Sequence, residues 1–145
     1  MIITVDTNVI YQALYSNKGA SHQILKLIRD EKVQLALSVP VFLEYCEVLQ
    51  RNKTLIETGL SIENIQAILD LLALTGLEKR ISFLFRPNLF DETDNKFIEL
   101  ALASQSEYLI TANVKHYKSN NELHYYRLRV VTPGDFIKLW RQNDE

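Results

Sequence analysis

The chain has 145 residues, of which 47% are hydrophobic, and a mean hydropathy near zero. A chain of this size and composition can bury the core of one domain but not comfortably two, so we expect a single domain over residues 1–145. No apolar run approaches the roughly 18 residues of a membrane-spanning helix, and the formal net charge of −2 excludes a global basic field for nucleic acid.

The hydrophobic pattern predicts strands that alternate with helices along the whole chain. Strands are inferred from short apolar runs, and helices from apolar residues that recur three or four positions apart. In the first half we expect a strand at 2–5, a helix at about 8–15, a helix capped by Ser21, a strand at 33–38, a helix starting at Pro40, and a long helix from Ser61 to Gly76. In the second half we expect a strand at 80–85, a helix with an acidic start at Asp91, strands at 107–111 and 129–132, and a last helix opened by Thr132 and Pro133.

This alternation favours an α/β fold. The predicted strands are continuous apolar runs, which is typical of parallel strands that are covered on both faces. We therefore expect a mostly parallel central sheet of about five strands flanked by helices. The order of the strands in the sheet does not follow from the pattern.

Acidic and polar residues follow the predicted strands at the ends where parallel sheets bind ligands. They are Asp6 after the first strand, Glu44 one turn into the helix after the second, Asp91 and Asp94 before the helix after the third, and Asn113 after the fourth. Because the carboxyl ends of parallel strands meet at one edge of a sheet, we expect these side chains to converge there.

Four converging carboxylates without matched arginines would repel one another, and a divalent cation would remove that repulsion. Scattered hard oxygen ligands suit Mg²⁺ or Mn²⁺, which can activate a water and stabilise charge on a phosphodiester. Each acid also has an ordinary interpretation: Asp6 or Asp94 could cap a helix, and Glu47 is an alternative to Glu44. An aspartyl-phosphate enzyme is disfavoured because position 8 is Asn.

A local basic stretch, residues 115–129 (KHYKSNNELHYYRLR), follows the expected site. It interleaves cations with tyrosines and histidines, a combination that suits the phosphates and bases of single-stranded RNA. Lys115, His116 and Lys118 come first and are the candidate RNA-binding residues. The alternative is a solvated loop in which the tyrosines are half buried.

The sequence resembles the PIN-domain ribonucleases, most closely the branch described as toxin components of prokaryotic toxin–antitoxin pairs. The similarity covers nearly the whole chain and rests on VDTNVI, on the acidic residue after the second strand, on DETDNKFIELALASQSEYLIT and on RVVTPGDFI. It implies a metal-dependent endonuclease acting on single-stranded RNA, a homodimer and an antitoxin partner. The single cysteine, with no secretory leader expected, suits the cytoplasm.

The resemblance also implies residue roles. Asp6, Glu44 and Asp94 match metal ligands, Asp91 matches an acidic position before the helix, and Thr7, Asn8 and Thr111 match polar supports. The sequence departs from the family at Asn113, where aspartate is common. An asparagine can coordinate through its carbonyl oxygen but brings no charge, so a second metal would be held more weakly. The alternative is a PIN-fold module that binds RNA or a protein without cleaving.

Overall fold

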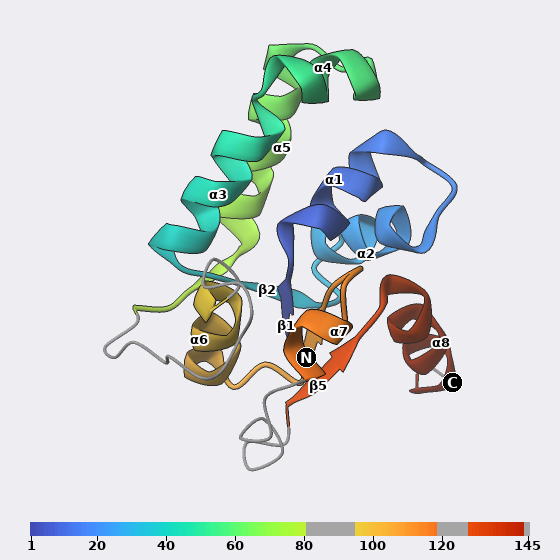
Figure 1. The fold of residues 1–145 in the computed structure, drawn as a ribbon. Coiled ribbons are helices and arrows are strands. Elements are labelled where there is room, and N and C mark those ends of the chain that lie inside the picture. Colours follow the sequence, from blue (N-terminus) through green and yellow to red (C-terminus); the bar gives the residue numbers. More distant parts are fainter. Residues whose placement is uncertain (81–94, 119–127, 144–145) are drawn as a thin grey trace.

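A computed structural model of the protein describes residues 1–80, 95–118 and 128–143 (Figure 1). Its strands form one sheet in the order β3-β2-β1-β4-β5, and every pair of neighbours is parallel. The strands are β1 Ile2–Val5, β2 Gln34–Leu37, β3 Leu77–Glu78, β4 Tyr108–Ile110 and β5 Arg129–Val131. The expected α/β fold with a parallel sheet of about five strands is confirmed.

Helices make the connections between the strands. They are α1 Thr7–Tyr15, α2 Ala20–Arg29, α3 Val39–Leu49, α4 Asn52–Thr58, α5 Ile62–Thr75, α6 Asn95–Ser104, α7 Lys115–Lys118 and α8 Pro133–Asn143. Helices α3 and α5 run side by side as an arm that carries α4 at its far end (Figure 1). Helix α6 packs against β1 and β2, close to the base of this arm. In the described ranges, no helix has the length and apolarity needed to cross a membrane.

The sequence predictions misplaced the start of one helix and missed three short elements. Helix α2 begins at Ala20, where Gly19 caps it with its backbone carbonyl, so Ser21 lies inside the first turn and is buried. The short helices α4 and α7 were not predicted. A strand that was not predicted, β3, pairs with β2 at 77–78, and residues 81–85 of the strand predicted at 80–85 lie outside the described part. A two-residue strand is too short to produce a recognisable hydrophobic run.

The long helix α5 follows its sequence signals closely. The Ser61 hydroxyl accepts from the Asn64 backbone N–H at 3.1 Å, and the Asn64 side chain accepts from the Ser61 N–H at 3.2 Å, which is a capping box. The helix ends before Gly76. A Cβ at that position would lie 2.3 Å from Cδ1 of Leu37, so glycine allows the end of α5 to approach β2.

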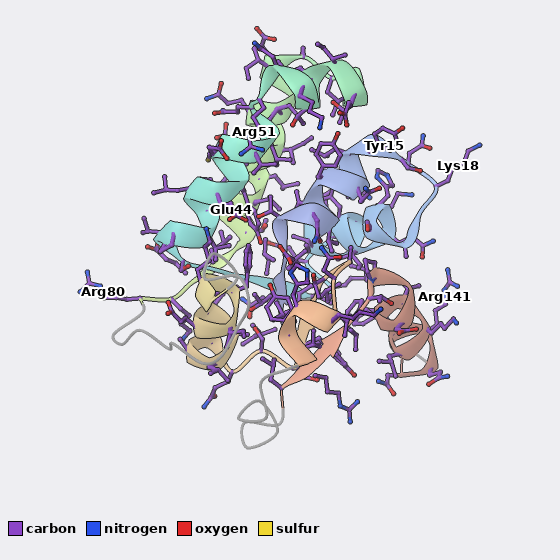
Figure 2. The ribbon with its side chains drawn as sticks, in the orientation of Figure 1. Tyr15, Lys18, Glu44, Arg51, Arg80 and Arg141 are labelled. Atoms are coloured by element: carbon purple, nitrogen blue, oxygen red, sulfur yellow. The ribbon has the colours of Figure 1, made fainter. Side chains whose placement is uncertain are left out.

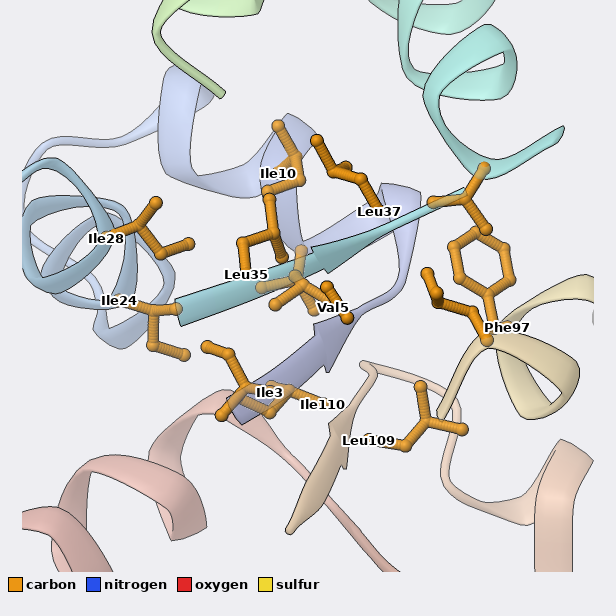
Figure 3. Close-up of a cluster of buried hydrophobic side chains, with 14 of the residues drawn as sticks. Ile3, Val5, Ile10, Ile24, Ile28, Leu35, Leu37, Phe97, Leu109 and Ile110 are labelled. Carbon is orange, nitrogen blue, oxygen red and sulfur yellow. The ribbon is translucent and has the colours of Figure 1, made fainter. Parts of the chain in front are cut away.

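The core lies around the central strands. After the first residue of β1 and of β2, the side chains of β1, β2 and β4 are buried. Figure 3 shows members of this core between Ile24 and Ile28 of α2 on one side and Phe97 of α6 on the other. The half-buried Cys46 packs against this core, as expected for a small apolar side chain. Because β1 is central, its carboxyl end meets the carboxyl ends of β2 and β4 at one edge.

Candidate functional site

Asp6 and Thr111 meet at the carboxyl end of the sheet. Strands β1 and β4 pair in parallel with Val5 opposite Ile110, so the residues that follow each strand lie side by side. The Asp6 backbone N–H donates to the Ile110 carbonyl at 2.9 Å, and the Thr111 hydroxyl donates to Oδ2 of Asp6 at 2.8 Å. Asp6 is only 7% exposed, and Thr111 is fully buried. Two residues 105 positions apart are thus joined at the centre of the sheet edge.

Further donors surround the same carboxylate oxygen. The Tyr117 hydroxyl donates to Oδ2 of Asp6 at 3.2 Å, and Nδ2 of Asn8 lies 3.5 Å from it. Asn8 also accepts from the backbone N–H of Ala112 at 3.2 Å, which ties α1 to the segment after β4. The predicted supporting residues Asn8 and Thr111 therefore lie around Asp6.

Tyr117 corrects one sequence interpretation. The basic stretch suggested that its tyrosines stack on RNA bases, but Tyr117 is fully buried, because α7 directs its ring inward to reach Asp6. Nothing in the local pattern KHYK distinguishes a buried tyrosine from a solvated one. Tyr117 follows Thr111 by six residues, and this spacing predicts a contact with Asp6 only if the short helix α7 is already known.

Tyr117→Phe should lower the free energy of unfolding by about 1.5–3 kcal/mol, because it removes a buried hydrogen bond to a charged group. The measurement is urea unfolding followed by circular dichroism. Tyr15→Phe is the matched control, since Tyr15 is 56% exposed and its hydroxyl should contribute little. Equal stabilities for the two variants would show that the Tyr117 hydroxyl does not hold the carboxylate.

Glu44 reaches the site from α3 and has two partners. The Thr7 hydroxyl donates to its Oε2, and Nζ of Lys96 lies 2.7 Å from its Oε1. The Glu44 and Lys96 side chains are 22% and 24% exposed. No role was predicted for Lys96 from the sequence. The one sequence signal that could have identified it is that several acidic residues at one edge of the sheet require a nearby positive charge.

The alternative acid, Glu47, lies in a different environment. Its carboxylate pairs with Arg51 at 2.6 Å, and both side chains are more than half exposed. In Figure 2, Glu44 lies nearer the sheet than Arg51, which is farther along the arm. The structure therefore favours Glu44 over Glu47 as the acid of the site.

The pKa of Tyr45 is affected by the negative charges of the site. Its ring is fully buried and its hydroxyl donates to the Val5 carbonyl. Burial, and then the negative charges of Asp6 and Glu44, raise the pKa of Tyr45 well above its ordinary value. Both carboxylates thus act on one hydroxyl, which stays protonated at neutral pH and keeps donating its hydrogen bond.

The other candidates are placed only in part. Asp91 and Asp94 lie outside the described residues. Asn113, Lys115 and His116 are exposed just beyond Thr111, and the Lys118 side chain is not described. Within the described ranges, no group of three or more His, Cys, Asp or Glu side chains could hold a metal ion. The two placed carboxylates, Asp6 and Glu44, would therefore need a further acid to complete such a site.

Comparisons with known proteins agree with this architecture. A family model described as PIN domain matches residues 3–115. One similar solved chain belongs to the crystal structure of VapBC2 from Rickettsia felis bound to a DNA fragment from their promoter, with 19% sequence identity, a TM-score of 0.57 and coverage of 91% of this chain and 98% of that chain. At this identity the likeness concerns the fold alone. No curated protein matches the sequence.

Proposed function

This chain belongs to the PIN-domain family of nucleases, and we propose that it is an endoribonuclease that hydrolyses phosphodiester bonds of single-stranded RNA with the help of Mg²⁺ or Mn²⁺. The observation that carries the proposal is the arrangement of Asp6 and Glu44 at one edge of a parallel sheet, each oriented by hydroxyl donors. The proposal treats residues 1–145 as one nuclease domain.

The donor set suits a hard divalent cation. Asp6 and Glu44 offer carboxylate oxygens, and Thr7, which follows Asp6 directly in the chain, donates to Glu44. We propose Asp6, Glu44 and Asp94 as ligands, with Asp91 as a fourth acid and the Asn113 carbonyl oxygen as a weaker one. An ion held there would activate a water and stabilise negative charge on the phosphodiester.

The chain's own residues would orient these ligands and guide the substrate. Thr111, Asn8 and Tyr117 fix Asp6, and Thr7 fixes one oxygen of Glu44. Donors of this kind typically contribute about 10- to 100-fold to metal affinity or activity. We assign phosphate contacts to Lys115, His116 and Lys118, because the first two are exposed directly beyond the site.

The biological context is proposed from the solved neighbour. That structure is a toxin–antitoxin complex, VapBC2, bound to promoter DNA. We propose that this chain is likewise the toxin of such a pair, acting in the cytoplasm as a homodimer and covered by an antitoxin. Three large apolar side chains, Val39, Leu43 and Leu74, are more than half exposed on the arm and support a protein interface there.

A cleavage assay tests the central proposal. The purified protein should cut single-stranded RNA in the presence of Mn²⁺, stop on addition of EDTA, and spare duplex RNA. Asp94→Asn should lose this cleavage, because it removes one of the proposed ligands. RNA binding without cleavage, unchanged by metal, would instead favour a binding module, for which Asn113 is the supporting residue.

A further inference from the structure

We propose that Lys96 is a positioning residue that occupies Glu44 in the metal-free protein and competes with a divalent cation for that carboxylate. The inference rests on the proposed metal site and goes beyond it, because it assigns a role to a residue that received none from the resemblance to PIN-domain ribonucleases. In this view the site carries its own cation until a divalent ion replaces it.

The contact between the two side chains is close and sheltered. Nζ of Lys96 lies 2.7 Å from Oε1 of Glu44, and about three quarters of each side chain is buried. The pair joins the first turn of α6 to α3, two helices that are far apart in sequence and packed against each other. It differs from the other described ion pairs, which join residues one or four positions apart and have at least one side chain more than half exposed.

Both oxygens of Glu44 are engaged in this arrangement. Oε2 accepts from the Thr7 hydroxyl, and Oε1 faces the Lys96 ammonium. A divalent ion that coordinates Oε1 of Glu44 would compete with the ammonium of Lys96, which lies against this oxygen, while Thr7 occupies a position on Oε2. The positive charge of Lys96 would also repel the incoming ion. Lys96 should therefore weaken metal binding while it keeps the acid ordered.

Titration of the full-length protein with Mn²⁺ by calorimetry tests this inference. Lys96→Met removes the charge and should tighten Mn²⁺ binding by about 3- to 10-fold, which is the size expected for one partly buried charge pair. Lys96→Arg keeps the charge and should gain no affinity. Lys53→Met is the control, since Lys53 pairs with Glu57 on α4, and its side chain is 82% exposed.

Thermal melting supplies a second readout. In EDTA, Lys96→Met should melt below the parent, because Glu44 has lost its cation. As Mn²⁺ is added, the difference should shrink, since a tighter-binding variant gains more stability from the same ligand concentration. A merely structural lysine would leave the difference unchanged at every Mn²⁺ concentration.

The outcomes separate the two proposals. Equal or weaker Mn²⁺ binding by Lys96→Met, with normal binding by the parent, would overturn the role of Lys96 and leave the proposed nuclease site standing. Absence of Mn²⁺ binding by the parent would overturn both. Tighter binding by the variant would support the inference whether or not RNA is cleaved.

Discussion

Asp6→Asn should reduce RNA cleavage by at least about 100-fold, beyond the 10- to 100-fold typical of residues that only orient metal ligands. The reason lies in the donors around Oδ2. Thr111 and Tyr117 both donate to this oxygen, so an asparagine would keep its carbonyl oxygen there and direct its NH₂ group to the other side. The variant would thus present hydrogens and no charge where the proposed ion binds.

Single-turnover cleavage rates and melting curves with and without Mn²⁺ measure this effect. The parent should gain melting temperature in millimolar Mn²⁺ by mass action, and Asp6→Asn should lose most of that gain. Asp70→Asn, an exposed acid on α5, should behave as the parent does. Melting in EDTA shows whether the variant still folds. Cleavage by a folded Asp6→Asn at the parent's rate would remove Asp6 from the proposed site.

Phe97→Ala should lower the free energy of unfolding by about 3–5 kcal/mol, because it opens a cavity in the core. Phe97 is 1% exposed and anchors α6 beside the sheet (Figure 3). Domains of ordinary stability have about 5–15 kcal/mol in total, so the variant should be close to unfolding at 37 °C. Since Lys96 precedes this residue, the ion pair with Glu44 should loosen as well.

Urea unfolding of Phe97→Ala and of Leu74→Ala provides the matched comparison. Leu74 is 84% exposed, so its truncation should change stability by no more than about 0.5 kcal/mol. Similar stability losses in the two variants would contradict the placement of Phe97 in the core. The more conservative Phe97→Leu should lose less, because most of the apolar volume remains.

The sheet was predictable because its strands are buried, and burial leaves continuous apolar runs such as residues 2–5. The strand order was not predictable, since several orders satisfy the same hydrophobic pattern. Strand β3 was not predicted, because it has only two residues and its position depends on the close approach of Gly76 to Leu37. Helix α5 was found with its limits because Ser61 and Gly76 mark them locally.

Part of the candidate site was likewise predictable from the sequence, and part was not. The meeting of Asp6 with Thr111 and Asn8 was predictable, because the ends of parallel strands share one edge. Lys96 and Tyr117 were missed because their roles depend on how α6 and α7 rotate against their neighbours, and one sequence does not determine that rotation. The roles of Asp91 and Asp94 stay predictions, since both lie outside the described residues.

The central position of β1 has a consequence for synthesis on the ribosome. Asp6 is made before its partners Thr111 and Tyr117, which follow it in the chain by more than a hundred residues. A nascent or prematurely terminated chain that stops before β4 therefore contains the acid without two of the three side chains that orient it. The order of synthesis should therefore delay the proposed activity until β4 and α7 have been made.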